Sequence, residues 1–363
     1  MIPTEPIGSI PRSPELLDVL QRYRAGGASA AELAEAYDEA LQDTVRRFEA
    51  TGSPIISDGE QRKSSFLTYP LEGLDNIAGD GLVIPFEDGH TRQLPRLTHG
   101  PFRYRNYAVK YLQSALHYAR VPVKQAVISA SALSLLYPER GLADYSREQF
   151  LNDLVREVAG DIRLCLDAGA HRVQIDFTEG RLAVKLDPSK VLLRQFIELN
   201  NRVLEQFSPE QRARIGVHTC PGGDHDSTHS ADVDYAQLLP DLFRLKADNF
   251  YVQLASERDP RRVLAVIKRC LQPHQRVYIG VIDVLDNRIE TPETVRDRVL
   301  LAAEYIAPEQ LGTTDDCGFS PFEDDTSTGR DIAFAKIRAR VLGTQMAEER
   351  LIPLHGANTS PAR

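Results

Sequence analysis

The residues best suited to chemistry are one histidine and two cysteines, carried by two segments far apart in the sequence. An apolar run over Arg214–Gly223 ends in His218, Thr219 and Cys220 and then breaks into proline and glycine. The segment Leu311–Gly318 likewise delivers Cys317. Side chains two apart on a strand point to the same face, so His218 and Cys220 can converge on one ion. Zinc takes imidazole and thiolate ligands together, and a Cys2His set leaves one position open, as catalytic zinc sites do.

A single His-x-Cys segment is weak evidence, because buried cysteines often serve only as small hydrophobic residues. Cys165 and Cys270 lie within helical patterns beside apolar residues, and we expect them to be structural. The metal hypothesis therefore depends on the elements that would position the other two cysteines.

Those elements alternate along the chain. We predict eight strands, at Thr4–Arg12, Pro54–Asp58, Val121–Ser129, Arg172–Phe177, Arg214–Cys220, Asn249–Leu254, Arg276–Val284 and Gln310–Thr314. Helical patterns are predicted at Pro14–Arg24, Ser29–Thr51, Phe150–Ala168, Ser189–Gln206, Tyr235–Leu245, Pro260–Cys270, Pro292–Ile306 and Asp331–Glu348. This alternation predicts a parallel sheet, and eight strands predict a (β/α)8 TIM barrel.

We expect one domain over residues 1–363, with a lid or hairpin region inserted after the second strand at 62–120. A doubly wound open sheet is the alternative. It usually needs a Gly-x-Gly-x-x-Gly turn after the first strand, and the sequence has none.

A barrel collects its active site at the carboxyl ends of its strands. The polar and thiol side chains at those ends are Ser9, Glu60, Asp176, His218, Cys220, Asp283 and Cys317. Taken singly, Glu60 or Asp176 would more simply be a loop or turn acid, but one barrel mouth would bring all seven together.

The composition of the chain limits the classes of molecule that it can bind. The net charge of −9 argues against nucleic acid and against an anionic membrane surface. We find no apolar run long enough to span a bilayer and no signal peptide, and four cysteines in so long a chain do not form a disulfide framework. We therefore expect a cytoplasmic protein with small-molecule substrates.

In their order along the chain, these motifs resemble the catalytic C-terminal barrel of the cobalamin-independent methionine synthase family and its short single-barrel relatives. The resemblance implies that Ile7, Gly8 and Ser9 hold the carboxylate of homocysteine. It implies that Glu60 and Asp176 bind its amino group. It also implies that His218, Cys220 and Cys317 bind Zn2+.

The chain departs from the family pattern at four places. Where the family has a fourth zinc ligand, a glutamate, this chain has Gln253, with Glu257 nearby as a substitute. Leu285 replaces the proton-donating histidine, which leaves Asp283 as the candidate acid. The chain has no tryptophan to stack on a pterin, and Tyr137 is an imperfect replacement. The amino-terminal half of the full-length synthases has no counterpart here.

These residues predict a zinc-dependent thiol alkyltransferase that activates a homocysteine-like thiol for transfer of a methyl or alkyl group. The departures argue against methyl-folate as donor, so a corrinoid protein or another small methyl compound is expected instead. The alternative is an epoxide-opening enzyme that resembles epoxyalkane:coenzyme M transferase. A decarboxylase barrel of the uroporphyrinogen type and a non-enzymatic zinc protein are weaker alternatives, because neither needs ligands so far apart with one position open.

Overall fold

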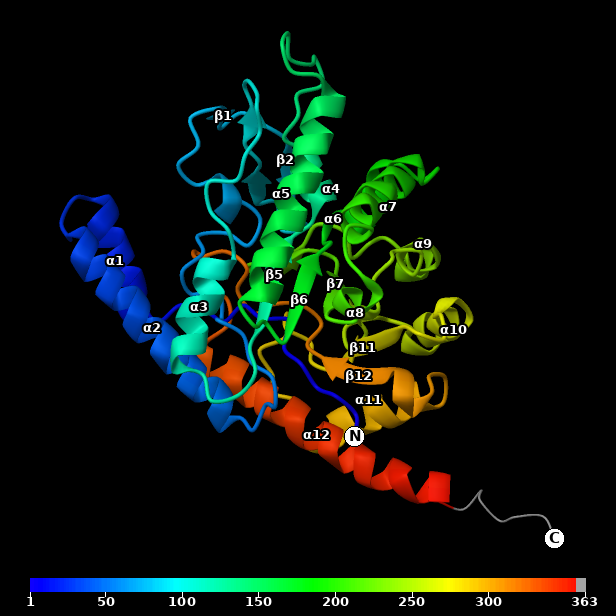
Figure 1. The fold of residues 1–363 in the computed structure, drawn as a ribbon. Coiled ribbons are helices and arrows are strands. Elements are labelled where there is room, and N and C mark those ends of the chain that lie inside the picture. Colours follow the sequence, from blue (N-terminus) through cyan, green and yellow to red (C-terminus); the bar gives the residue numbers. More distant parts are fainter. Residues whose placement is uncertain (357–363) are drawn as a thin grey trace.

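The centre of the molecule is a six-stranded parallel sheet, seen in a computed structural model that describes residues 1–356, with side chains described to residue 351 (Figure 1). The strands are β5 (Lys124–Ile128), β6 (Arg172–Asp176), β7 (Ile215–Thr219), β10 (Asn249–Val252), β11 (Arg276–Gly280) and β12 (Leu311–Thr314). They lie side by side in that order, all parallel. Nearly every strand residue is buried, as expected for a sheet covered on both faces.

Two further segments close this sheet into a barrel. Thr4 pairs with Thr313 on β12, and Ile56 pairs with Val123 beside β5. The two segments meet where Ile10 N donates to Gly59 O at 3.0 Å. The predicted (β/α)8 barrel is thus confirmed, and the strands, taken up in chain order around it, do not form a doubly wound sheet.

The first two predicted strands, Thr4–Arg12 and Pro54–Asp58, are much shorter in the structure than expected. Each contributes a single parallel bridge. Proline has no N–H to donate to a sheet ladder, and Pro6, Pro11 and Pro54 interrupt these two segments.

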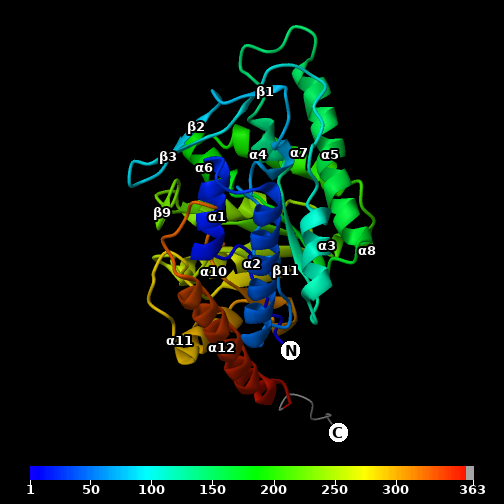
Figure 2. The same cartoon turned by 90° about the vertical axis from the view of Figure 1, so that its left-hand side faces the viewer.

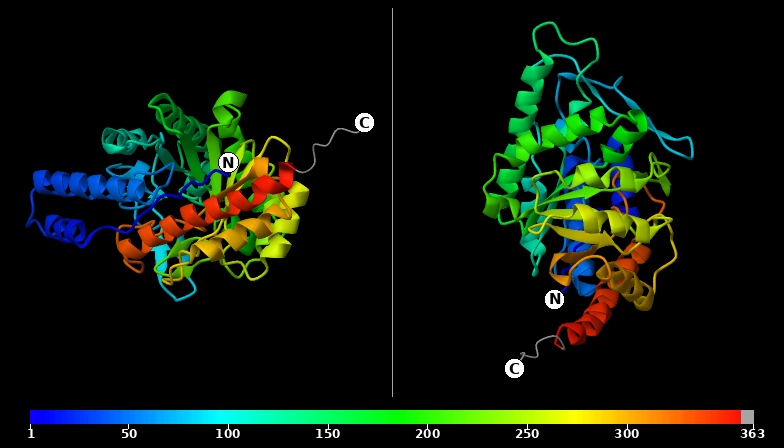
Figure 3. Two further views of the ribbon diagram at one scale, coloured as in Figure 1. Left: turned by 90° about the horizontal axis from the view of Figure 1, so that it is seen from below. Right: turned by 90° about the vertical axis from the view of Figure 1, so that its right-hand side faces the viewer.

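The helices form a ring around the sheet, and the amino-terminal segment lies inside the ring (Figure 3). They are α1 (Pro14–Arg24), α2 (Ala30–Ala50), α3 (Val109–Tyr118), α4 (Ala130–Ser134), α5 (Arg147–Asp167), α6 (Glu179–Leu186), α7 (Val191–Leu204), α8 (Pro209–Arg212), α9 (Leu239–Leu242), α10 (Pro260–Cys270), α11 (Pro292–Ala303) and α12 (Arg330–Gly356). Short 3-10 turns lie at Tyr69–Leu71, Tyr235–Gln237 and Pro308–Gln310. None of the helices among the described residues is both long and apolar enough to cross a membrane.

Serine side chains fix several helix starts. Ser29 and Ser146 each form a capping box, with Glu32 and Gln149 respectively, which satisfies amide groups that the first turn leaves free. The helices α1 and α2 form an antiparallel pair on one side of the barrel, and α12 crosses beneath them to pack on α11 (Figure 2). The predicted helix at Tyr235–Leu245 divides into a 3-10 turn and the short α9, and the short helix α6 was not predicted.

In the segment between Ile56 and β5, small hairpins lie over the carboxyl ends of the strands, whereas α3 packs on the side of the barrel against α2 and α5 (Figure 1). The segment contains the antiparallel pairs β1 (Ile77–Ala78) with β4 (Arg96–Leu97) and β2 (Val83–Pro85) with β3 (Thr91–Gln93). A third small hairpin, β8 (Gly223–Asp224) with β9 (Ser227–Thr228), follows β7. The structure also places the helix α3 within 62–120, where a lid or hairpin region was expected. The assignment of the whole chain to one domain remains a prediction.

Candidate metal centre and its pocket

The structure brings His218, Cys220 and Cys317 together. His218 lies on β7, Cys220 directly follows that strand, and Cys317 follows β12. Their ligand atoms lie within 4.8 Å of one another, and the two Sγ atoms are 3.0 Å apart. All three side chains are buried. Two thiols and an imidazole at this separation form the Cys2His donor set that suits Zn2+.

The surroundings of His218 fit a metal ligand. Its Nδ1 lies 3.1 Å from Asp176 Oδ1, which also accepts a hydrogen bond of 2.7 Å from Gln174 Nε2. Its Nε2 is buried and has no hydrogen-bond partner among the described residues. A carboxylate on one ring nitrogen sets the tautomer and orientation of a metal-binding histidine, and the other nitrogen is left for the ion.

The pKa values of the cluster indicate protons that a bound metal ion could displace. Burial alone would lower the pKa of His218, but Asp176 and the neighbouring Cys317 outweigh it and raise that pKa to about 9. The contact with Cys220, together with burial, raises the pKa of Cys317 well above its ordinary value. His218 and Cys317 therefore hold protons at neutral pH that a bound metal would displace.

The predicted substrate-binding residues lie beside this cluster. Ile7, Ser9, Glu60 and Asp176 line the same pocket as the three metal ligands. Ser9 Oγ accepts a hydrogen bond of 3.1 Å from Ser320 N. The chain comes so close here that a Cβ on Gly318 would lie 2.1 Å from Ser9 Oγ, so this position requires glycine. Gly8 contributes its carbonyl oxygen, which accepts from Ser57 Oγ at 2.6 Å.

Glu60 already has a cationic partner that the sequence analysis did not identify. Lys63 Nζ donates to Glu60 Oε1 at 2.8 Å and to Ala126 O at 3.0 Å, and both side chains are buried. Burial raises the pKa of Glu60, and the nearby Lys63 ammonium partly offsets this. The backbone of Glu60 is left-handed, with φ at 55°, a local geometry that residue patterns do not reveal.

The two candidate fourth ligands lie together but are occupied by an arginine. Arg181 Nη1 contacts Gln253 Oε1 at 3.1 Å and Glu257 Oε1 at 2.8 Å. Gln253 Nε2 also donates to Ser256 Oγ at 2.6 Å. Neither side chain lines the pocket. Among the described residues, the group of candidate ligands at this pocket therefore consists of His218, Cys220 and Cys317.

Three other residues that the sequence analysis singled out do not line the pocket. Asp283 Oδ1 accepts a hydrogen bond from Leu285 N at 3.0 Å, in the turn after β11. Tyr137 stacks on Phe150 with ring centroids 5.5 Å apart, and its hydroxyl donates to Tyr145 O. None of Asp283, Leu285 and Tyr137 is among the residues that line the pocket.

A second imidazole in the pocket, His229, was not identified from the sequence. It follows β9, is buried, and shares a hydrogen bond between Nδ1 and Ser230 Oγ. Ser230 Oγ in turn donates to Pro221 O at 3.2 Å, so Nδ1 carries the proton. Burial and the nearby Lys185 and Arg181 lower the pKa of His229 to about 4. It is therefore a neutral hydrogen-bond acceptor at pH 7.

The rest of the pocket is largely apolar, and much of it comes from the inserted segment. Its apolar lining is Ile7, Phe66, Leu67, Ile84, Phe86 and Phe322. The aromatic residues of this lining lie in irregular loops without periodicity, so no sequence pattern marked them as neighbours of the thiols.

Comparison with known proteins identifies one family, to which the matched relatives also point. Residues 2–331 match the family described as "Cobalamin-independent synthase, Catalytic domain". A methionine synthase of Sulfurisphaera tokodaii is 23% identical over 358 residues, which cover 97% of this chain and 94% of that protein. One of Sulfolobus acidocaldarius is 24% identical over 363 residues, which cover 99% and 96% respectively.

The fold has solved counterparts. The structure of a B12-independent methionine synthase from Shewanella sp. W3-18-1, in complex with selenomethionine, superposes with a TM-score of 0.74. That likeness covers 97% of this chain and 99% of the other at 19% sequence identity, and so concerns the fold alone. The family match, which spans nine-tenths of the sequence, shows that this chain belongs to the cobalamin-independent methionine synthase family of methyltransferase enzymes.

Proposed function

We propose that this enzyme is a zinc-dependent thiol alkyltransferase that transfers a methyl or alkyl group to a homocysteine-like thiol. The observation that carries the proposal is the convergence of His218, Cys220 and Cys317 at a pocket that also contains Ser9, Glu60 and Asp176. Zinc bound there would lower the pKa of a coordinated thiol, so that a thiolate nucleophile is available at neutral pH.

The chain's own residues orient the ligands and the thiol substrate. Asp176 fixes the ring of His218 through Nδ1. Ser9, Glu60 and Asp176 line the pocket, and we expect them to orient the carboxylate and the amino group of the substrate. The apolar lining from Phe66 and Phe86 excludes water from the reacting thiol, which strengthens each electrostatic contact in the pocket.

The proposal also concerns the methyl donor, for which this chain differs from the family pattern. Transfer from a folate nitrogen requires a proton for the departing amine. Leu285 occupies the position of the family's proton-donating histidine, and His229 is neutral at pH 7 because its pKa is lowered to about 4. The sequence has no tryptophan to stack on a pterin. We therefore propose that methyl-folate is a poor donor and that a methylated corrinoid or another small methyl compound serves better.

The decisive experiment combines metal analysis with a donor panel. The purified enzyme should hold about one zinc per chain and should methylate or alkylate homocysteine. Methyl-tetrahydrofolate, its polyglutamate form, a methylated corrinoid and a simple epoxide would be compared as donors. Efficient turnover of the folate would overturn the proposal about the donor, and zinc-independent turnover would overturn the proposal about the metal.

The ion pair of Glu60 with Lys63 favours a second candidate, an epoxide-opening thiol transferase whose thiol has no amino group. A carboxylate that is already neutralised has less need of a substrate ammonium. Equal affinity of the parent and Glu60→Gln for homocysteine, with turnover of the epoxide, would select this candidate.

A further inference from the structure

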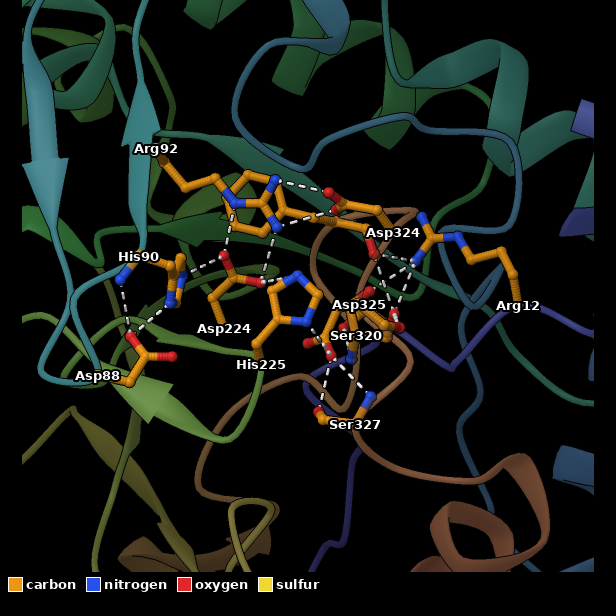
Figure 4. A network of polar contacts seen from close by, with 12 residues as sticks. Arg12, Asp88, His90, Arg92, Asp224, His225, Ser320, Asp324, Asp325 and Ser327 are labelled. Carbon is orange, nitrogen blue, oxygen red and sulfur yellow. Dashed lines mark hydrogen bonds and ion pairs between the residues drawn. The ribbon is translucent and has the colours of Figure 1, made fainter. Parts of the chain in front are cut away.

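Three loops from distant parts of the chain meet beside the pocket. Arg92 lies on β3 of the inserted segment. Asp224 lies four residues after Cys220, and Asp324 lies seven residues after Cys317. Figure 4 shows the Arg92 side chain between the two carboxylates. One guanidinium therefore connects the loop of each candidate thiol ligand with the inserted segment.

The contacts use both edges of the guanidinium. Nε and Nη2 donate to Asp224 Oδ2 and Oδ1 at 2.5 and 3.0 Å. Nη1 and Nη2 donate to Asp324 Oδ2 and Oδ1, both at 2.9 Å. Paired parallel hydrogen bonds between arginine and carboxylate are strong and fix the relative orientation of the groups. Two such pairs on one planar group fix the distance between the two aspartates.

The contacts of Arg92 with Asp224 and Asp324, here called the clamp, are strengthened by their surroundings. The side chain of Asp224 is fully buried, and that of Arg92 is 23% exposed. The guanidinium also lies 4.1 Å from the centre of the Phe322 ring, which lines the pocket. Backbone contacts join the same loops, because Glu87 N donates to Thr228 O at 3.0 Å and Phe66 N donates to Pro321 O at 3.1 Å. Charge-assisted bonds gain strength where water is excluded, as it is at the buried carboxylate of Asp224.

We propose that Arg92 is a positioning residue for the metal centre. Its guanidinium holds the Cys220 loop and the Cys317 loop at the separation that allows both thiols to contact one ion. This inference rests on the proposed zinc site, but it concerns a residue that touches neither the metal ligands nor the metal.

The same loops contain a second cluster of side chains that could bind a metal, and the contacts of Arg92 give that cluster another role. Ligand atoms of Asp224, His225 and Asp325 lie within 4.8 Å of one another. However, Arg92 takes both oxygens of Asp224, and His90 Nε2 lies 3.1 Å from Oδ2. A second cation would face the guanidinium at close range, so we assign this group to loop anchoring and not to a second metal site.

The first test measures zinc affinity by competition with a chelator, using Zn2+ alone. We expect Arg92→Met to weaken zinc binding by about tenfold or more, as loss of groups that support metal ligands does. Arg92→Lys should recover only part of the loss, because lysine keeps the charge but not the paired geometry. Asp324→Asn, at a carboxylate that is 59% exposed, should weaken binding without endangering the fold.

The matched control is Arg96→Met. Arg96 lies on neighbouring β4, is 22% exposed, and forms the same paired contact with Asp80 at 3.0 and 2.9 Å, away from both thiol loops. The zinc affinity of the Arg96→Met variant should equal that of the parent. Unchanged affinity in Arg92→Met and Asp324→Asn, or an equal loss in Arg96→Met, would overturn the inference.

A second readout needs no metal. In the zinc-free protein, the rates at which N-ethylmaleimide alkylates Cys220 and Cys317 would be followed by peptide mass spectrometry, with buried Cys165 as internal reference. Arg92→Met should accelerate both relative to Cys165, and Arg96→Met should not. A parent that binds no zinc would refute the proposed function, while the alkylation rates would still decide the inference: equal rates in the parent and Arg92→Met would refute it.

Discussion

At the scale of single residues, the two close thiols are the part of the site that depends most on a metal. Cys220 and Cys317 are free, buried and 3.0 Å apart, although 97 residues separate them in the chain. The hydrogen bond with Cys220 and burial raise the pKa of Cys317, and two thiolates at this distance would in addition repel each other without a cation. A bound metal removes this conflict.

Substitution of either thiol should therefore abolish metal binding. Cys220→Ser and Cys317→Ser should each retain less than about a tenth of the parent's zinc, because a hydroxyl is a poor replacement for a thiolate ligand. Metal content per chain by plasma mass spectrometry is the measurement. Cys165→Ser and Cys270→Ser should keep their zinc. Full zinc in both site variants would show that the ligands are misassigned.

The ion pair between Glu60 and Lys63 gives a second test at this scale. Removing one partner leaves the other charge buried, which typically costs about 3–5 kcal/mol, whereas removing both is often close to neutral. Glu60→Gln and Lys63→Met should each lower the free energy of unfolding by roughly 3 kcal/mol. The double variant should recover most of that loss. Additive losses in urea unfolding would mean that the two side chains do not act as a pair.

The sequence predicted the metal cluster better than its surroundings, for a physical reason. His218, Cys220 and Asp176 lie at the ends of apolar strands, so the barrel alone determines that they converge. The partners of Glu60 and of Gln253 depend instead on local geometry, such as the left-handed φ at Glu60 and the place of Arg181 on helix α6, which was not predicted. Residue type and spacing contain no signal for these contacts.

At the scale of elements, the short helix α6 brings a buried acid close to the site. Glu179 begins this helix, directly after the β6 loop, and its Oε1 accepts hydrogen bonds from Ser129 Oγ at 2.7 Å and from Ser131 Oγ. Burial raises the pKa of Glu179 to about 7, although the two serine hydrogen bonds oppose the rise. The folded protein therefore holds a proton that the unfolded chain releases near pH 4.5.

This proton makes stability depend on pH. Below about pH 4.5, Glu179 is protonated in both the folded and the unfolded state, and its full contribution to the free energy of unfolding is present. As pH rises to about 7, the unfolded chain loses its proton first, so the free energy of unfolding falls by about 3 kcal/mol. Glu179→Gln should remove that part of the fall, as measured by urea unfolding between pH 4.5 and 8. Parallel curves for parent and variant would contradict the assignment.

The sequence also predicted elements unevenly. Helices with serine caps, such as α1 and α5, begin within a few residues of their predicted positions. Strands 3 to 8 likewise match, because long apolar runs define them. The first two strands were predicted too long, since their prolines stop the ladder after one bridge.

At the scale of the whole molecule, the metal would connect two strands that are not neighbours in the sheet. β7 and β12 are separated by two strands in the sheet, and their loops meet at the cluster. A ligand that binds only the folded state stabilises it, by about 2.7 kcal/mol at a hundredfold excess over its dissociation constant. Zinc should thus raise the unfolding temperature by at least roughly 3 °C. Calorimetry with zinc and with chelator measures this, and Cys317→Ser should show no difference.

The junction between the first two barrel segments has a consequence for backbone dynamics. The main chains of these segments are joined by one printed hydrogen bond among the described residues, Ile10 N to Gly59 O, and the other bonds between them come from side chains such as Ser57 and Arg12, whereas the ladders of β6, β7 and β10 are continuous. Amide hydrogen exchange should therefore be faster at Ser9, Ile10 and Gly59 than along β7, because local opening suffices there. Equal protection by mass-resolved exchange would show that the junction is as firm as the sheet.

That junction carries Ser9 and Glu60, while the continuous sheet carries His218 and the ends of the two thiol loops. The enzyme thus forms its pocket from two walls: one with little main-chain pairing, for part of the substrate's handle, and one of continuous ladder, for the ion. Substitutions in the first wall can alter which thiol is accepted without breaking the ladder, although Glu60 is also held by its ion pair with Lys63. Substitutions in the second disturb the ladder itself, so new substrate preferences in this barrel should arise along the junction first.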